Sequence, residues 1–181
     1  MSHSRLFQHE PRWLSVNHAQ RKTLPLDLQS WLSESESLTQ RLRNQFQNIH
    51  VQVLFEKQQT PFLTERRLLN LPERRYGLVR EVVLLSNETP LILARTVIPE
   101  KTLNITQGNL ARLGSRPLGE ILFSAPSLER KSVGIARIEP NLWTSNFDLQ
   151  ITAPLWGRRT QYSICKQPML VSEFFLPSLF L

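Results

Sequence analysis

The sequence predicts an α+β fold built on a single antiparallel β-sheet, and three observations support this. Strand-like runs of apolar or alternating residues fill the middle and the end of the chain. Two of these runs, residues 75–85 and 91–98, are separated only by the turn-like segment SNETP, which indicates a hairpin. Helical patterns lie before and between the strand runs, and nothing alternates in the manner of βαβ units. We therefore expect helices gathered around one antiparallel sheet.

Two short amphipathic helices are predicted before the first strand. The first begins near Thr23, with Thr23 as N-cap and Pro25 in the first turn. The serine-rich segment 33–37 separates it from a second helix with apolar residues at i, i+4 and i+8. The apolar positions are Leu28, Trp31 and Leu32 in the first helix and Leu38, Leu42 and Phe46 in the second. Two helices joined by this hinge would form a cover over a sheet.

The remaining elements follow from the same periodicities. We expect strands at 49–57, 75–85, 91–98, 128–138, 158–165 and 169–176, the last two joined by a turn at KQP. A helix is expected from about Thr106 to Gly114, with Leu110 and Leu113 facing inward, and a further helical turn over 116–123. Residues 139–154 are expected to be a long connection.

Length and composition indicate one domain. The chain has 181 residues, of which 40% are hydrophobic and 20% charged, enough to bury a sizeable core. We expect a single domain over residues 1–181, with residues 1–22 as a flexible N-terminal extension. No signal-peptide core is visible, and no run approaches the roughly 18 apolar residues of a membrane helix. We expect a cytoplasmic protein without stable membrane insertion, and a monomer by default.

The charge and the reactive side chains exclude several function classes. The formal net charge is +7, which suits an anionic partner, but the basic residues are spread along the chain, so nucleic acid is not expected. The single cysteine, Cys165, fits a reducing compartment and is expected to lie half-buried in a strand. The four histidines lack metal-ligand spacing, so no metal site is expected.

Three charged residues interrupt strand faces that are otherwise apolar. Arg80 alternates with Leu78 and Val82. Arg95 and Glu173 occupy comparable positions in the strands 91–98 and 169–176. A buried charge without a partner costs several kcal/mol, so each needs a counterpart.

Two arrangements would satisfy these charges. In the first, Arg80 or Arg95 pairs with Glu173 or Glu81, or lies on a solvated face. In the second, the sheet face lines a closed pocket in which the arginines bind a ligand carboxylate through bidentate hydrogen bonds. Glu173 would then hold a hydroxyl group or transfer a proton. The residue pattern by itself leaves both open.

Five motifs in order extend this interpretation. The series LVREVVLL, ARTVIP, RPLGEILF, LWGRR and LVSEFFLP, between about Leu71 and Leu176, resembles the chorismate lyase family of ubiquinone biosynthesis. The resemblance implies conversion of chorismate to 4-hydroxybenzoate and pyruvate without a cofactor. It also implies an antiparallel sheet with a buried site closed by helix-loop flaps, and a product that is released slowly.

The resemblance also implies roles for individual residues. The arginine of the L-x-R-E motif, which binds the ring carboxylate, is Arg80 here, and the acidic residue of the last motif is Glu173. Leu118, in the P-L-G motif, contacts the bound ring through its main chain, and Leu38 occupies the first flap. Arg95 is our candidate for binding the enolpyruvyl end.

Two departures and one rival interpretation accompany the resemblance. Ala94 stands where the family motif often has glycine, which adds a methyl group beside the pocket, and the segment 139–154 is longer than usual. The rival is a non-catalytic domain that senses a small carboxylate, because the same fold serves as the effector domain of some transcription regulators. Only about two dozen residues precede the first predicted helix, too few for the helix-turn-helix domain of such regulators.

Overall fold

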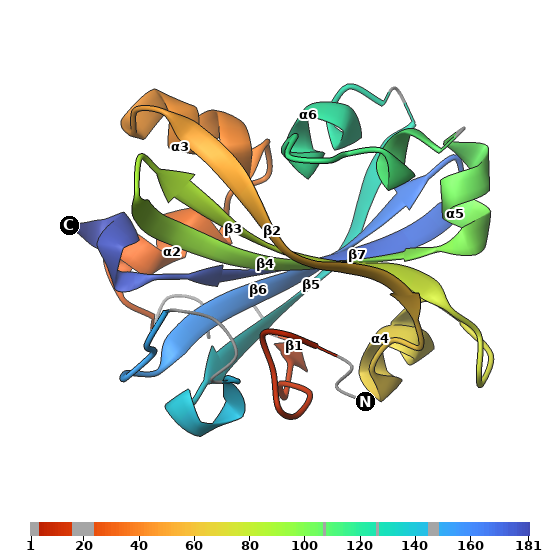
Figure 1. The fold of residues 1–181 in the computed structure, drawn as a ribbon, viewed down its shortest axis with the longest axis horizontal. Helices are drawn as coiled ribbons and strands as arrows, with labels where there is room; N and C mark the ends of the chain where they lie inside the picture. Colours follow the sequence, from red (N-terminus) through yellow and green to blue (C-terminus); the bar gives the residue numbers. More distant parts are fainter. Residues whose placement is uncertain (1–3, 16–23, 107, 126, 145–148) are drawn as a thin grey trace.

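A computed structural model describes residues 4–15, 24–106, 108–125, 127–144 and 149–181. Within these ranges, one sheet of seven strands has the order β1-β5-β6-β7-β4-β3-β2, and every neighbouring pair is antiparallel (Figure 1). The strands are β1 Leu14–Ser15, β2 Ile49–Gln59, β3 Gly77–Ser86, β4 Thr89–Pro99, β5 Leu128–Ile138, β6 Leu155–Ile164 and β7 Gln167–Phe175. The predicted α+β fold with one antiparallel sheet is confirmed.

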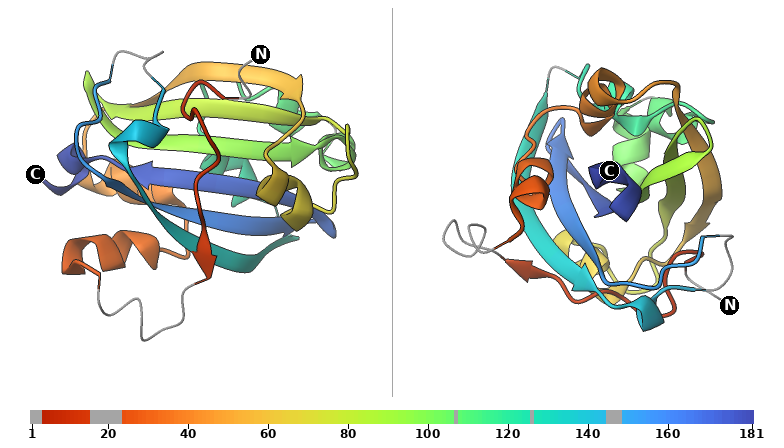
Figure 2. Two further views of the ribbon diagram at one scale, coloured as in Figure 1. Left: turned by 90° about the horizontal axis from the view of Figure 1, so that it is seen from below. Right: turned by 90° about the vertical axis from the view of Figure 1, so that its left-hand side faces the viewer.

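Short helices cover both faces of this curved sheet (Figure 2). The α-helices are α2 Leu26–Leu32, α3 Leu38–Gln45, α4 Leu63–Leu68, α5 Glu100–Ile105 and α6 Leu118–Leu122; the 3-10 helices are η1 Asn109–Ala111, η2 Pro140–Leu142 and η3 Pro177–Phe180. In Figure 1, α2, α3 and α6 lie on one side of the sheet, whereas α4, η2 and the first described residues lie on the other. The central strands β3, β4, β6 and β7 are therefore buried on both faces, whereas β2 and β5 remain partly exposed.

Apolar residues pack differently on the two faces. On the first, Leu28, Trp31 and Leu42 from α2 and α3 pack against the sheet residues Val82 and Phe175. On the second, the core comes from alternate residues of the same strands, which include Val83, Leu93 and Phe174. This division follows from the alternation of side chains along each strand. It explains why β3 and β4 read as continuous apolar runs.

The N-terminal segment is part of the second face. Leu6 and Phe7 are 0% and 2% exposed, and the Phe7 ring lies 4.7 Å from that of Trp143 and 5.0 Å from that of Phe174. The strand β1 pairs with β5. The expectation that residues 1–22 form a flexible extension is therefore wrong for residues 4–15.

The helical predictions were right in kind but wrong at several boundaries. The first helix begins at Leu26, so Pro25 takes the N-cap position rather than the first turn, and Thr23 lies outside the described residues. The helix expected from Thr106 instead forms directly after β4, as α5, and only the short η1 follows. The helix α4 was not predicted, because its pattern is short and largely polar.

The turn between the last two long strands was expected at residues 166–168, and the structure places it one residue earlier, at Cys165 and Lys166. Cys165 and Lys166 connect β6 to β7 with φ angles of 48° and 64°, a left-handed pair that suits a tight antiparallel hairpin. The Cys165 side chain is exposed. The expectation of a half-buried strand cysteine was therefore wrong.

Candidate active site

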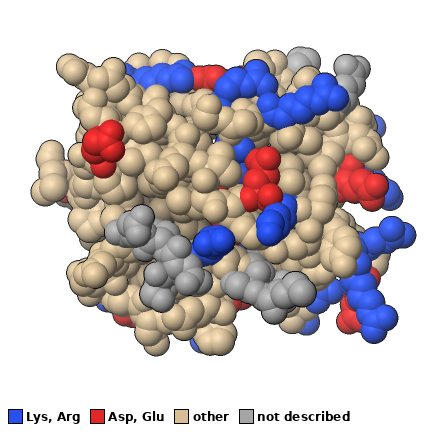
Figure 3. All heavy atoms as spheres, viewed as in Figure 1, with Lys and Arg blue, Asp and Glu red and all other residues tan. Residues whose placement is uncertain are grey.

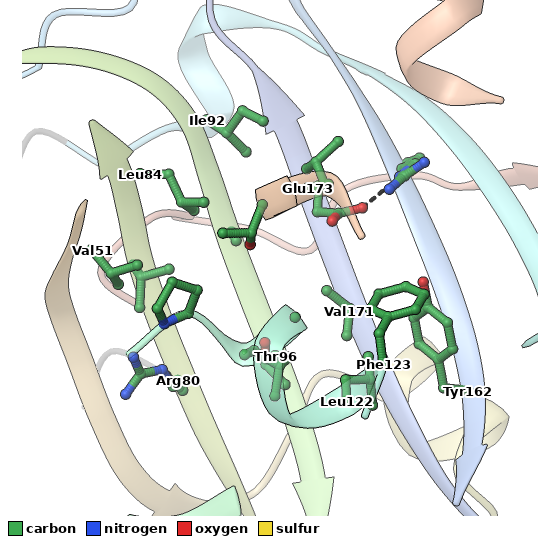
Figure 4. Close-up of a pocket in the computed structure, with 18 of the residues that line it drawn as sticks. Val51, Arg80, Leu84, Ile92, Thr96, Leu122, Phe123, Tyr162, Val171 and Glu173 are labelled. Carbon is green, nitrogen blue, oxygen red and sulfur yellow. Dashed lines mark hydrogen bonds and ion pairs between the residues drawn. The ribbon is translucent and has the colours of Figure 1, made fainter. Parts of the chain in front are cut away.

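A pocket lies between the first face of the sheet and the flap helices α3 and α6 (Figure 4). Its floor is apolar and comes from β3, β4 and β7, with Val82, Leu84, Ile92, Ala94 and Val171. The centre of a water-sized sphere can move through about 60 Å³ of this space. One water molecule needs only roughly 10–15 Å³ by this measure, so the pocket has room for more than a single water.

The two flaps meet over the pocket. Leu38 and Leu118 are the first residues of α3 and α6, and both line the pocket. A Cβ on Gly119 would lie 2.9 Å from the Ser37 hydroxyl oxygen, so glycine is needed where α6 approaches the start of α3. Arg43 and Glu120 form an ion pair across the same junction. The structure thus contains the helix-loop cover that the sequence indicated.

Arg80 lies in β3 with its side chain only 3% exposed and directed to the pocket face. Its Nη1 donates to Glu56 Oε2 at 2.6 Å, and its Nη2 donates to the Gly114 carbonyl at 2.8 Å. These contacts orient the guanidinium between the sheet and the chain leading into α6. The Glu56 side chain is 30% exposed, so this ion pair lies near the rim of the pocket.

Glu173 reaches the pocket from β7 and is paired with an arginine that the sequence had not singled out. Arg158 Nε, in β6, donates to Glu173 Oε2 at 2.5 Å, the dashed line of Figure 4. Arg158 is 1% exposed and also lines the pocket. Burial alone would lower the pKa of Arg158, but the charge of Glu173 and their hydrogen bond outweigh burial and raise it. Arg158 is therefore charged at all ordinary pH values.

Arg80 and Glu173 lie on different sides of the pocket, with β4 between their strands (Figure 4). Arg80 is in register with Thr96, and Glu173 with Ala94. Two strand spacings and two residue rises separate their Cα atoms, which corresponds to roughly 12 Å. The site thus offers a cation at one end and a carboxylate at the other, with apolar residues between them.

Arg95 is not part of this pocket. It is in register with Glu81 and lies on the second face of the sheet, where its Nη1 donates to Glu81 Oε1 at 2.6 Å. Its Nε and Nη2 donate to the two carboxylate oxygens of Glu65, at 2.7 and 2.9 Å. The expectation that Arg95 binds the enolpyruvyl end is wrong, because side chains alternate along β4 and Ala94 and Thr96 take the pocket face.

Tyr162 adds a hydroxyl group to the pocket wall. It lies in β6, two residues beyond Thr160, is 5% exposed, and directs its ring along the pocket (Figure 4). Burial raises the pKa of the Tyr162 phenol, and the nearby charge of Glu173 raises it further. The phenol is therefore a protonated hydrogen-bond donor at neutral pH.

Sequence reasoning missed Arg158 for a specific reason. The strand was expected to begin at residue 158, which put both arginines of WGRR at a strand end, where charges are usually solvated; in the structure both are at least 90% buried. Consecutive strand residues face opposite sides, so Arg158 faces the pocket and Arg159 the second face. Extending β6 back to Leu155 would have placed both arginines inside the strand rather than at its end.

No metal centre is evident in the part of the chain that the structure describes. Among those residues, His, Cys, Asp and Glu do not gather in groups of three or more. On the face shown in Figure 3, Lys and Arg side chains occupy several separate places, some of them beside acidic side chains, rather than one block. Of the described helices, none is long and apolar enough to cross a membrane.

The site is thus an apolar cleft on one face of a curved antiparallel sheet, with the buried Arg80 at one end and the Arg158–Glu173 ion pair at the other. The sequence model of the chorismate lyase family matches residues 9–181. The chain belongs to this family.

Similar proteins agree with this assignment. The chain is 42% identical over 154 residues to a probable chorismate pyruvate-lyase of Methylococcus capsulatus, covering 83% of this chain and 95% of that one. It is 33% identical to a probable chorismate pyruvate-lyase of Nitrosomonas eutropha, with 86% and 89% covered. Among solved structures, the effector domain of PhnF from Mycobacterium smegmatis superposes with a TM-score of 0.59 at 12% identity, covering 79% of this chain and 90% of that one. At that identity the likeness concerns the fold alone.

Proposed function

We propose that this protein is a chorismate lyase, which converts chorismate to 4-hydroxybenzoate and pyruvate as the family does in ubiquinone biosynthesis. The observation that carries the proposal is the pocket, in which Arg80 and Glu173 reach opposite ends of one apolar cleft. The family match over residues 9–181 and the names of the curated relatives support it.

The chemistry requires little beyond orientation and charge control. The C–O bond to the enolpyruvyl group breaks, and the carbon bearing the ring hydroxyl loses its hydrogen. The departing enolpyruvate gains a proton to become pyruvate, and the ring becomes aromatic. Since aromatisation drives the reaction, a site that holds the substrate in a reactive conformation accounts for much of the catalysis.

Each end of the pocket suits one end of the ring. In our proposal, the Arg80 guanidinium binds the ring carboxylate, because its planar fork matches a carboxylate. Glu173 accepts a hydrogen bond from the ring hydroxyl at the opposite end. The main chain at Leu118 and the side chain of Leu38 contact the ring from the flaps.

The flaps give the proposal a kinetic consequence. A closed cover over an aromatic product makes release the slow step, and product inhibition is the expected sign. Substitution of Leu38, or of the hinge residues 33–37, should alter the inhibition constant of 4-hydroxybenzoate more than the chemical step. An unchanged inhibition constant with a slower chemical step would contradict this assignment of the flap.

The decisive experiment is direct turnover. The purified protein is incubated with chorismate, 4-hydroxybenzoate is followed by its absorbance, and pyruvate is measured separately. Equal amounts of both products are expected. A protein that binds 4-hydroxybenzoate tightly but forms no product would instead be a sensor, the alternative that the effector-domain fold raises.

The role of Glu173 is tested with the same assay. If Glu173 only orients the hydroxyl, Glu173→Gln keeps measurable turnover, because an amide oxygen still accepts a hydrogen bond. If Glu173 is the essential base, turnover collapses. Either result fits a lyase, and the comparison decides how the ring loses its hydrogen.

We also propose that residues 1–181 form one domain that acts as a monomer in the cytoplasm. The match of one family model to residues 9–181 supports a single domain. Sedimentation of the purified protein and fractionation of the source cells would test the two statements.

A further inference from the structure

We propose that Arg158 is a positioning residue, which orients Glu173 and at the same time fastens the first flap over the pocket. This inference rests on the proposed function, since it assigns a role within that site. It is carried by three hydrogen bonds from one buried guanidinium.

The first contact joins Arg158 to the end of the pocket that recognises the hydroxyl. Arg158 and Glu173 are directly in register between β6 and β7, and Nε donates to Oε2 at 2.5 Å. One carboxylate oxygen is thereby held by the protein. The carboxylate cannot turn without breaking a charge-assisted hydrogen bond, so its orientation toward a ligand hydroxyl is set by Arg158.

The other two contacts join Arg158 to the first flap. Its Nη1 donates to the carbonyl oxygens of Trp31, at 3.0 Å, and Glu34, at 2.7 Å. These carbonyls lie at the C-terminal end of α2 and in the segment that leads to α3, where a helix leaves carbonyl groups without intrahelical partners. A cation is well placed at that end of a helix.

The guanidinium is rigid and planar, so its three contacts are not independent. A shift of the end of α2 together with the segment 33–37 must either break the bonds to Trp31 and Glu34 or move the group that holds Glu173. Opening of the flap is therefore coupled to loss of the oriented carboxylate. Release of the product and recognition of its hydroxyl group therefore both depend on Arg158.

The chain offers two matched controls. Arg159 is the next residue, is 8% exposed, and faces the second side of the sheet, where its Nη1 donates to Thr64 Oγ1 at 2.7 Å. Arg41 also fastens the first flap, but its hydrogen bonds go to the Ser30 carbonyl, at 2.7 Å, and to the side chains of Ser30 and Glu34 rather than to the pocket. The first controls for loss of a buried arginine, and the second for a loosened flap.

The first test compares two ligands that differ by one hydroxyl group. Binding of 4-hydroxybenzoate and of benzoate is measured by titration calorimetry. The wild type should prefer 4-hydroxybenzoate by about 10- to 100-fold, the range expected for a hydrogen bond to a charged group. Arg158→Met should lose most of this preference and bind benzoate nearly as before. Arg159→Met and Arg41→Met should keep the preference.

The second test asks whether Arg158 acts through Glu173. If it does, the double variant Arg158→Met/Glu173→Gln should lose no more hydroxyl preference than Glu173→Gln alone, because the two changes remove one interaction. This double variant also leaves no unpaired charge in the pocket, and Arg158→Lys keeps the charge while losing the fork. Both remain informative if Arg158→Met folds poorly.

The outcomes separate this inference from the proposed function. A wild type that neither prefers 4-hydroxybenzoate nor turns over chorismate refutes both. A wild type that does both, together with Arg158 variants that keep the preference, refutes the role of Arg158 alone. Losses that multiply in the double variant would also refute it, because independent losses indicate a general structural effect.

Discussion

Replacing Arg80 by methionine tests the carboxylate end of the pocket. The change removes the guanidinium but fills a similar volume, so the apolar floor stays packed. A ligand carboxylate would lose two charge-assisted hydrogen bonds, each worth about 1.5–3 kcal/mol. The sum of about 3–6 kcal/mol predicts that 4-hydroxybenzoate binds roughly 10²- to 10⁴-fold more weakly.

The fold should survive this change. The acceptors that Arg80 leaves behind are Glu56, which is 30% exposed, and the carbonyls of the exposed residues Gly114 and Arg116. Water can reach these acceptors, so the cost to stability is about 1–2 kcal/mol. For a chain of this size that corresponds to a melting temperature lower by about 2–8 °C.

The assay combines titration calorimetry with 4-hydroxybenzoate, initial rates with chorismate, and thermal denaturation. Glu56→Gln is the matched control, because it removes the ion-pair partner but keeps the guanidinium, and it should bind 4-hydroxybenzoate much better than Arg80→Met. If Arg80→Met binds 4-hydroxybenzoate within about threefold of the wild type, the loss is smaller than one hydrogen bond. The assignment of Arg80 to the carboxylate would then be refuted.

Three further predictions concern the rest of the sheet. Arg95→Met leaves the carboxylates of Glu65 and Glu81 buried without their cation, so thermal denaturation should show a loss of about 3–5 kcal/mol, whereas KM of the folded fraction should change little. Because burial raises the pKa of Tyr162, its contribution to stability is complete below its ordinary pKa of about 10 and is lost as pH rises above it. Tyr162→Phe should therefore flatten the fall in melting temperature between about pH 9 and 11, and an equally steep fall would contradict this. Ala94→Gly removes a methyl group in register with Glu173, so the inhibition constant of 4-hydroxybenzoate should rise about fourfold with less change in kcat.

Alternation along single strands singled out Arg80 and Glu173, and only the resemblance of the motifs assigned them to a site. Arg80 and Glu173 each stand alone as a charge on an apolar face, and that local pattern survives folding because the register within a strand is fixed by its own geometry. The same reasoning failed for Arg95, because alternation does not say which of the two faces of a doubly covered strand carries the pocket. Arg95 pairs with Glu81, one of the two arrangements that the pattern had left open.

The sequence by itself determined the class of fold, the order of its six long strands, the family and the two charged residues proposed for the ends of the pocket. These depend on local periodicity and on motifs that follow one another along the chain. Only the tertiary structure decided that Arg158 pairs with Glu173, that Arg95 faces away, and that residues 4–15 are buried. Those outcomes depend on which strands become neighbours, in which register, and on which segment covers each face. Contacts between residues far apart in the chain are set by packing of the whole sheet, and no local pattern encodes them.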